Sequence, residues 1–249
     1  MCIKDTNFCC RIMKDSIKEL NISGFDLKLY TAGHVFEPNL TTRLLAESVD
    51  IPKGSSVLDL GCGVGPIAII AAKKGAGEVY AVDVMDEACA YAARNVEENG
   101  VADRVRVIQS DLFSNIPDKK FDIIINDVSG MADIVSRISP WYPETIPTGG
   151  YDGTEPTIRM LTEAREHLND NGILYFPVLS LADQKKILNK ANELYNNGLE
   201  PVSKKMVPFC QEFKDRLKDL EDLRNRGIID YVVKRSRYLW SLEIYKATA

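Results

Sequence analysis

A buried-strand pattern that ends in closely spaced glycines constrains this chain more than any other feature. The apolar run Val57–Leu60 leads into Gly61-Cys62-Gly63-Val64-Gly65, a helical pattern follows, and a second apolar run ends at Asp83. Glycine lets the backbone approach a ligand because no Cβ stands in the way. An acid at the tip of the next strand can accept hydrogen bonds from both hydroxyls of a ribose. The unit therefore predicts a site for an adenosine-containing ligand.

The spacing of the glycines indicates which class of nucleotide ligand the site would bind. A dinucleotide site uses G-x-G-x-x-G, with a helix N-terminus facing the pyrophosphate, but here the third glycine comes one residue early and Pro66 follows. The sequence contains no G-x-x-x-x-G-K-[ST] phosphate loop. The stretch Asp59–Gly65 resembles motif I of class I S-adenosylmethionine (SAM) methyltransferases. The resemblance implies a cofactor without phosphate, so an acid such as Asp59 is tolerated beside the turn.

Strand and helix patterns alternate along the chain. Strands are expected at 56–60, 78–83, 104–109, 121–126, 173–178, 228–233 and 238–245, and helices at 66–74, 86–98, 155–169, 181–196 and 210–225, with one more after Asn39. This succession predicts an α/β, Rossmann-like fold with a mostly parallel seven-stranded sheet and helices on both faces. The methyltransferase resemblance implies that the last strand is antiparallel.

Residues 1–35 are expected to form a small N-terminal cap or lid, and residues 36–249 the SAM-binding catalytic domain. A helical apolar stripe precedes an alternating, strand-like pattern in the cap, and these patterns comprise Ile12, Met13, Ile17 and Leu20, then Phe25, Leu27 and Leu29. The cap is expected to pack against the body. Covering the cofactor, or exchange between two subunits of a homodimer, is left open.

Composition narrows the function classes. The net charge is −5 and the pI about 5.3, so the sequence shows no broad electrostatic footprint for nucleic acid, and none is expected as partner. The six cysteines form no C-x-x-C pair and the two histidines are isolated, so we expect reduced thiols and no metal. The negative net charge favours small molecules or proteins as substrates. Neither a membrane span nor a secretory signal is visible in the sequence, which predicts a cytoplasmic enzyme.

The resemblance also implies which residues hold SAM. Asp111 follows the third strand, where the class I family places an acid on the adenine amino group, and Leu112 or Phe113 is expected to flank the adenine ring. The full set of expected cofactor residues is Asp59, Gly61, Gly63, Asp83, Val84, Asp111, Leu112, Asn126 and Thr41.

Further matches point to one branch of the family. Val35-Phe36-Glu37-Pro38 and Gly149-Gly150-Tyr151-Asp152-Gly153 resemble glutamine-N5 methyltransferases of the release-factor type, and small-subunit ribosomal guanine methyltransferases share parts of the pattern. Those enzymes carry Asn/Asp-Pro-Pro-Tyr/Phe after the fourth strand, but this chain has Asn126-Asp127-Val128-Ser129-Gly130. Both prolines and the aromatic ring that would hold a planar amide or base are missing. The glutamine and guanine specificities are therefore not carried over.

Two reactions fit the remaining polar groups. In the first, the enzyme transfers the SAM methyl group to a small molecule, and Asp127 removes a proton from the acceptor if burial raises its pKa. In the second, SAM is the only substrate and its own amine displaces methylthioadenosine, leaving azetidine-2-carboxylate. Asn126 and Ser129 would then hold the amine and Tyr175 would face the sulfonium. The strand-four motif resembles that of azetidine-2-carboxylate synthases.

A third class, a SAM-binding protein without catalysis, is less favoured because the expected cofactor residues are intact. No DNA-binding appendage such as a helix-turn-helix is visible. The segment Trp141-Tyr142-Pro143 lies where related enzymes place a substrate loop, and it is expected to supply the aromatic wall that strand four lacks.

Overall fold

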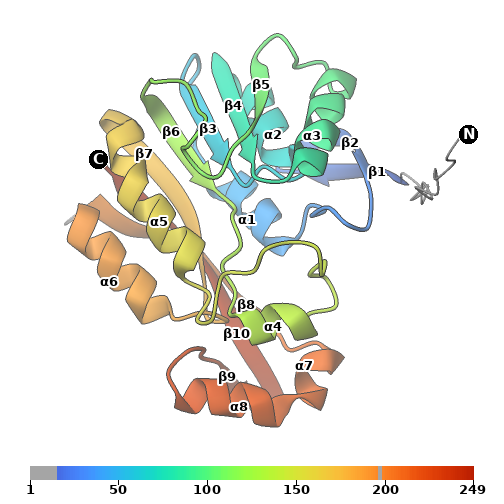
Figure 1. Cartoon of the computed structure of the whole chain (residues 1–249), viewed down its shortest axis with the longest axis vertical. Coiled ribbons are helices and arrows are strands. Elements are labelled where there is room, and N and C mark those ends of the chain that lie inside the picture. Colours follow the sequence, from blue (N-terminus) through green and yellow to red (C-terminus); the bar gives the residue numbers. More distant parts are fainter. Residues whose placement is uncertain (1–15, 196–197) are drawn as a thin grey trace, which may run out of the picture.

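Most of the strands join one twisted sheet, and a two-stranded hairpin stands apart from it (Figure 1). The computed structural model describes residues 16–195 and 198–249. The strands are β1 Ser16–Ile22, β2 Phe25–Thr31, β3 Ser56–Leu60, β4 Glu78–Asp83, β5 Val105–Gln109, β6 Phe121–Asn126, β7 Leu168–Leu179, β8 Leu199–Pro208, β9 Val232–Lys234 and β10 Arg237–Thr248. The helices are α1 Leu40–Ser48, α2 Pro66–Lys74, α3 Asp86–Glu98, α4 Asp133–Ile138, α5 Glu155–Ala164, α6 Gln184–Tyr195, α7 Gln211–Asp215 and α8 Leu217–Asn225, with a 3-10 turn at Arg165–His167.

The sheet has the predicted mixed topology. Its order is β5-β4-β3-β6-β7-β10-β8, with β9 paired to β10. The five strands from β5 to β7 are parallel, whereas β10 runs antiparallel to both β7 and β8. The core is divided between the two faces of the sheet: α1, α2 and α3 contribute to one apolar cluster, and α5 and α6 to the other. This confirms the expected α/β, class I methyltransferase-type fold.

Local sequence explains the central elements well. Strands β3, β4 and β6 carry apolar residues in nearly every position, and they are buried on both faces, as parallel strands between two helix layers must be. Helix α2 begins at Pro66, which needs no N–H partner in the first turn, and ends at Gly75 in the left-handed region. These elements match the predicted bounds residue for residue.

The outer part of the sheet differs from the prediction. The strand beside β10 is β8, which the sequence did not reveal, and the expected strand at 228–233 is reduced to Val232–Lys234. Strand β8 is mostly exposed and contains Pro201 and Pro208, so it lacks the apolar alternation of a half-buried strand. Edge strands tolerate charge and proline because one side has no ladder to complete. Helix 210–225 is divided into α7 and α8.

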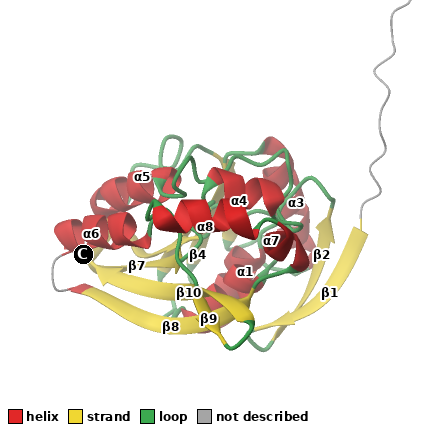
Figure 2. Ribbon diagram, turned by 90° about the horizontal axis from the view of Figure 1, so that it is seen from below, coloured by secondary structure: helices red, strands yellow, loops and turns green. Residues whose placement is uncertain are grey.

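The expected helix in the N-terminal cap is wrong for the part of the cap that the structure describes, which begins at residue 16. Ile17 and Leu20 lie in β1, which pairs antiparallel with β2, while Ile12 and Met13 fall outside the described residues. The hairpin contacts α1, α2 and α3. Figure 2 shows it at the side of the molecule, away from α5 and α6. Division of the chain at residue 35 stays a prediction.

Two asparagines of α3 complete the hydrogen bonds of β2. The fully buried Asn95 accepts from the Tyr30 amide at 2.7 Å and donates to the Tyr30 carbonyl at 3.0 Å. Its side chain also lies 2.9 Å from the carbonyl of Val64, inside the glycine turn. Asn99 forms the same pair of bonds with Lys28, at 3.2 and 2.9 Å. One side chain thus ties the hairpin, the helix and the glycine turn together.

We expect Asn95→Ala to lower the free energy of unfolding by roughly 3 kcal/mol, because it leaves several buried backbone groups without partners. Asn99→Ala is the matched control: it removes a similar pair of bonds from a more exposed site, where water can replace them, and should cost about 1 kcal/mol. Urea unfolding of both variants measures the difference. Equal losses of unfolding free energy in the two variants would show that the burial of Asn95 adds nothing to its contribution.

Candidate functional site

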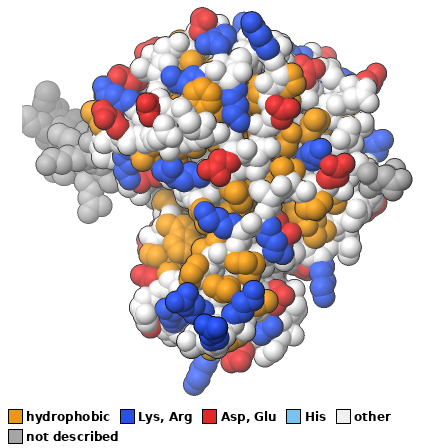
Figure 3. All heavy atoms as spheres, turned by 180° about the vertical axis from the view of Figure 1, so that it is seen from behind, with side chains coloured by type: hydrophobic (Ala, Val, Ile, Leu, Met, Phe, Trp, Pro, Cys, Tyr) orange, Lys and Arg blue, Asp and Glu red, His pale blue; other side chains and the backbone are white. Residues whose placement is uncertain are grey.

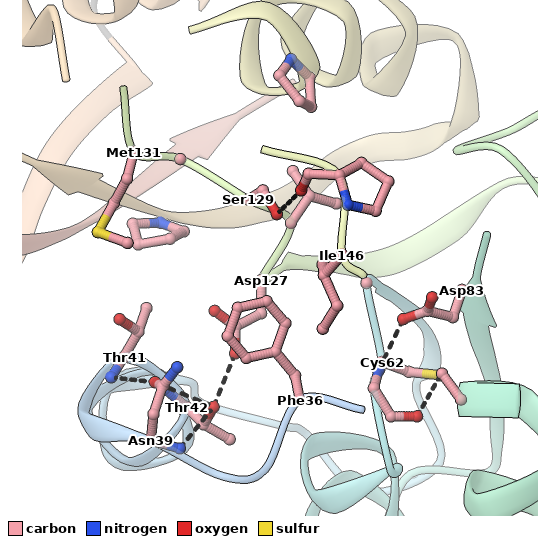
Figure 4. Close-up of a pocket in the computed structure, with 18 of the residues that line it drawn as sticks. Phe36, Asn39, Thr41, Thr42, Cys62, Asp83, Asp127, Ser129, Met131 and Ile146 are labelled. Carbon is pink, nitrogen blue, oxygen red and sulfur yellow. Dashed lines mark hydrogen bonds between the residues drawn. The ribbon is translucent and has the colours of Figure 1, made fainter. Parts of the chain in front are cut away.

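A cavity of about 650 Å³ opens at the carboxyl ends of the parallel strands (Figure 4). Ligands of open α/β sheets bind at this edge, where the strand order reverses. The glycine turn, the segments after β4, β5 and β6, and the loop before α1 all contribute to its walls. Among the residues predicted from sequence, those that line it are Thr41, Gly61, Gly63, Asp83, Val84, Asp111, Leu112, Asp127 and Ser129.

Asp83 connects the end of β4 to the glycine turn. Its carboxylate accepts the Gly63 amide at 2.9 Å and the Met85 amide at 3.0 Å. Burial raises the pKa of Asp83, and these amides oppose the rise. Gly61 is required for another reason: a Cβ there would lie 3.0 Å from the backbone nitrogen of Val128. The turn therefore packs directly against the segment that follows β6.

Asp111 is held by an arginine that the sequence did not assign to the site. The guanidinium of Arg159, on α5, forms two hydrogen bonds to the Asp111 carboxylate, at 3.1 and 3.2 Å. Both side chains are about half exposed and both residues line the cavity. Leu112, next to Asp111, has a φ of +49°, in the left-handed region. The carboxylate is thus fixed in orientation before any ligand binds.

Asp127 lies directly after β6, and its environment is unusual for a carboxylate. The hydroxyl of Thr42 donates to it at 2.9 Å, and Thr42 is itself placed by the Asn39 cap of α1, whose side-chain oxygen accepts the amides of Thr41 and Thr42 (Figure 4). Burial raises the pKa of Asp127 to about 7. A carboxyl group that titrates near neutral pH can accept and release protons under working conditions.

Asp59 does not reach the cavity wall. It is fully buried in β3, and its carboxyl oxygens have no hydrogen-bond partner within the described residues. Burial, and then the nearby Asp127, raise the pKa of Asp59 well above its ordinary value. Asp59 is one residue before the end of β3, so it lies within the strand and not in the glycine turn that lines the cavity. The expected direct contact of Asp59 with the cofactor is therefore not supported by its placement.

Asn126 and Tyr175 are also absent from the residues that line the cavity. Asn126 is the last residue of β6, fully buried, and neither atom of its amide has a partner within the described chain. Tyr175 lies four residues before the end of β7, since that strand continues to Leu179, and its side chain belongs to the core on the α1 side. Neither residue lines the cavity in this structure, and the sulfonium contact expected of Tyr175 and the roles expected of Asn126 stay predictions.

Ser129 is engaged by a loop above the cavity. The hydroxyl of Tyr142 lies 2.5 Å from the Ser129 hydroxyl and 2.6 Å from the Pro147 carbonyl, which also accepts from Ser129 at 2.8 Å. The Tyr142 ring meets Phe36 edge-on at 5.0 Å, so segments from both sides close over the cavity. Ser129 thus anchors this roof rather than presenting a free hydroxyl.

The far end of the cavity was missed from the sequence. Apolar side chains from β7, β8, β10 and the loop after α4 line it: Pro177, Leu179, Val207, Trp240 and Trp141. Trp141 was expected as an aromatic wall, and it packs on Phe213 of α7 at 5.4 Å. Pro177 and Trp240 lie within strands expected at 173–178 and 238–245, Leu179 is one residue beyond the first of these, and Val207 is in β8, which was not recognised. Apolar residues in strands carry no signal that separates a cavity wall from core.

No three His, Cys, Asp or Glu side chains gather as a metal site in the residues that the structure describes. In the same ranges, no helix has the length and apolar composition needed to cross a membrane. Cys62, Cys89 and Cys210 are free thiols, and Cys2, Cys9 and Cys10 fall outside the described residues.

The residues present fit an adenosyl sulfonium cofactor. The cavity volume is in the range of small-molecule sites, roughly 300–1,000 Å³. Asp83 presents a carboxylate at the end of the second strand of the unit, and half-exposed Val84 follows it. Asp83 and Asp127 are acidic groups that would favour a cation, whereas a phosphate would be repelled.

Comparisons with known proteins support the same ligand. Residues 28–127 match the family model of the methyltransferase small domain. A putative protein N5-glutamine methyltransferase of Methanocaldococcus jannaschii is 31% identical over 190 residues, covering 76% of this chain and 93% of the relative. The release factor glutamine methyltransferase of Rhodopirellula baltica is 35% identical over 176 residues, covering 65% of this chain but only 58% of that protein.

Solved structures share the fold at low identity. A 16S rRNA methyltransferase of T. thermophilus, in complex with AdoMet and guanosine, superposes with a TM-score of 0.62 at 16% identity, covering 94% of this chain and 50% of that one. A putative methyltransferase complexed with SAH gives a TM-score of 0.56 at 14% identity, covering 92% and 55%.

These comparisons correct two expectations. The relatives are named for protein glutamine or release factors, and the neighbour with the higher TM-score of the two for ribosomal RNA, so an acceptor limited to small molecules and the exclusion of nucleic acid are both wrong as predictions. The cyclisation alternative, with SAM as the only substrate, finds no support among them. The cofactor expectation is confirmed. The chain belongs to the methyltransferase small-domain family of class I methyltransferases, enzymes that use S-adenosylmethionine.

Proposed function

We propose that the enzyme transfers the methyl group of SAM to an amino nitrogen of a protein of the translation apparatus. The observation that carries this proposal is Asp127, a largely buried carboxyl group at the end of β6 with a pKa of about 7. The names of the relatives support a protein acceptor. The chemistry at Asp127 supports an amine as the nitrogen that is methylated.

An amine and an amide make different demands on the site. An ammonium group has no lone pair until it loses a proton, so it needs a base, whereas an amide needs a planar platform that aligns its nitrogen. The segment Asp127–Gly130 offers a carboxyl group and neither proline nor an aromatic ring. Phe36 lies at the cavity, but its ring packs edge-on against Tyr142. The site is therefore better suited to deprotonation than to stacking.

The proposed step is a direct displacement. Asp127, as a carboxylate, takes a proton from the acceptor ammonium, which leaves a neutral amine. The amine lone pair forms the new bond to the methyl carbon, and the C–S bond breaks with its electron pair on sulfur, giving S-adenosylhomocysteine. The positive charge passes from sulfur to the methylated nitrogen. Alignment of the amine with the S–CH3 bond supplies most of the remaining catalysis.

The cofactor roles that we assign follow the cavity wall. Asp83 accepts the ribose hydroxyls, Asp111 accepts from the adenine amino group while Arg159 holds it, and Val84 and Leu112 flank the adenine. Gly61 and Gly63 supply backbone beside the methionine part, and Thr41 stands at the N-terminus of α1. Ser129 keeps the roof in place.

Transfer of a labelled methyl group tests the proposal. Purified enzyme, methyl-labelled SAM and an undermethylated cell extract should give label in protein. Strong acid then distinguishes the nitrogen: a methylated amine survives as a methylated amino acid, whereas a methylated amide releases labelled methylamine. Label that is volatile after hydrolysis, or that nucleases remove, would contradict an amino acceptor.

Replacing Asp83 tests the cofactor site. We expect Asp83→Ala to weaken SAM binding by about 3 kcal/mol, roughly 100-fold, because two hydroxyl groups lose a charged acceptor. Glu97→Ala, an exposed acid on α3, is the control and should bind as the wild type does. Titration calorimetry with SAM measures both. An unchanged affinity of Asp83→Ala would remove the ribose assignment.

Replacing Asp127 tests the base. We expect Asp127→Asn to lower kcat/KM for the acceptor by roughly 10²–10⁴-fold. The wild-type profile should rise with pH through the pKa of the carboxyl group, which is about 7 without SAM and lower with the sulfonium bound, and then level off until the acceptor itself titrates. The variant should lack this limb while still binding SAM. A parallel profile for wild type and variant would exclude Asp127 as the base.

The same substitution should stabilise the fold. The folded-state pKa of about 7 lies above the ordinary 3.8, so the protein binds this proton more tightly folded than unfolded, and stability falls as pH rises from 3.8 to 7. Asp127→Asn removes that penalty. We expect a gain of roughly 2–4 kcal/mol at pH 8 that shrinks below pH 7 and vanishes near pH 4. Thermal unfolding across this range is the measurement, and a pH-independent difference would contradict it.

A further inference from the structure

The lobe that follows β8 distributes its charges unevenly between strands and helices. Residues 201–211 and 231–242, in β8, β9, β10 and their ends, contain five Lys or Arg and no Asp or Glu. Residues 212–230, in α7, α8 and their flanks, contain five Lys or Arg and six Asp or Glu. Figure 3 shows Lys and Arg side chains gathered at the lower end of the molecule, beside hydrophobic ones. The strand side of the lobe is basic although the whole chain is acidic.

Ion pairing differs between the two sides for the arginines. On the helix side all three arginines are paired, as Arg216–Asp219, Arg224–Asp230 and Arg226–Asp222, whereas Lys214 and Lys218 form no ion pair with any described residue. On the strand side Lys204 pairs with Glu243. The other four cations, Lys205, Lys234, Arg235 and Arg237, form no ion pair or side-chain hydrogen bond with any described residue. Four exposed cations are thus available to a partner.

Three of these cations share one small hairpin. Lys234 and Arg237 lie directly opposite each other on β9 and β10, an arrangement in which like charges repel. Arg235, in the turn between them, has a φ of +57°, which residues other than glycine rarely adopt. The nearest acid in the sequence, Asp230, is paired with Arg224 and not with these cations. An anionic partner would relieve it.

Apolar side chains accompany the cations. Val232 and Val233 on β9 are 39% and 50% exposed, and Met206 on β8 is 37% exposed. Exposed apolar groups among unpaired Lys and Arg suit RNA, because phosphates contact the cations while bases and sugars cover the apolar groups. The chain as a whole carries −5, so a polyanion is repelled elsewhere and guided to this face.

The hairpin lies further along the sheet than the far end of the cavity. Val207 and Trp240, paired on β8 and β10, line the cavity, and Arg237 is three residues before Trp240 on the same strand. Three residues of strand span about 10 Å, and because side chains alternate, those of Arg237 and its partner Lys234 point to the opposite face of the sheet from Trp240. A molecule bound to these cations would therefore lie about 10 Å along the sheet from the far end of the cavity, on the other face.

We propose that the β9–β10 hairpin binds a single-stranded segment of RNA through Lys234, Arg235 and Arg237, on the face of the sheet opposite the far end of the cavity. This inference extends the proposed function and rests on it. The acceptor protein would be methylated while it is part of an RNA-containing particle. The RNA contact itself is measurable without any acceptor, so failure of one claim is separate from failure of the other.

The test compares two triple variants of equal charge change. The hairpin variant is Lys234→Gln, Arg235→Gln and Arg237→Gln, and the matched control is Lys214→Gln, Lys218→Gln and Arg226→Gln on the helix side. Binding of a fluorescein-labelled, 20-nucleotide single-stranded RNA is titrated at several salt concentrations. SAM affinity and circular dichroism confirm that each variant is folded.

We expect wild type and control to bind with affinities within about twofold of each other, and the hairpin variant at least tenfold more weakly at low salt. The slope of log affinity against log salt should fall by about 2 in the hairpin variant, since each phosphate contact to a single strand contributes about 0.7. Equal losses in both variants, or no binding by wild type at low salt, would overturn the proposal. Tighter binding of a polyglutamate peptide than of the RNA would assign the surface to an acidic protein instead.

Discussion

Burial of three acids at neighbouring strand ends governs the chemistry of this molecule. Asp59, Asp83 and Asp127 belong to the ends of β3, β4 and β6, which converge because parallel strands share one carboxyl edge. Burial raises the pKa of all three, and the charges of Asp127 and Asp83 raise that of Asp59 further. Without a cation, these groups bind protons more tightly than a free aspartate does. A sulfonium among these groups would shift them toward the charged form, so the cofactor and its site are electrostatically matched.

The three acids differ in what holds them, and this separates their roles. Two backbone amides fix Asp83 to the glycine turn, one threonine hydroxyl fixes Asp127, and Asp59 has no partner within the described residues. Asp83 is therefore held in one orientation, which suits a group that binds the cofactor. Asp127, with a single hydrogen bond and access to the cavity, can change its protonation state with little rearrangement. Asp59 has its pKa raised well above the ordinary value by burial and then by the nearby Asp127.

The sequence predicted the centre of the fold better than its margins, for physical reasons. In β3, α2, β4 and α3, strong apolar patterns and clear helix ends coincide with the true bounds, because central parallel strands must be apolar on both faces. Strand β8 is an edge strand, held by its pairing with β10 rather than by its own composition. Cap residues Ile17 and Leu20 fit a helical spacing, yet pairing with β2 overrides it.

The predicted residues that line the cavity lie at or just after strand ends: Asp83 is the last residue of β4, Asp127 directly follows β6, and Asp111 is two residues after β5. Asp59 and Asn126, at the ends of β3 and β6, are fully buried and do not line it, and the sequence does not distinguish the two cases. Tyr175 lies inside β7, which continues to Leu179. Thr42, Arg159 and Trp240 reach the cavity through tertiary contacts between distant segments, so no local pattern assigned them to the site.

The hydrogen bonds of Asn95 constrain how the sequence of this chain can change in evolution. Because a single amide satisfies both main-chain groups of Tyr30 and one of Val64, the hairpin and the glycine turn cannot drift independently. A relative that lacks the hairpin would have to fill position 95 with something that leaves the Val64 carbonyl satisfied, and a relative that keeps it should keep the asparagine. Among relatives, asparagine at this helix position should therefore occur together with an N-terminal hairpin.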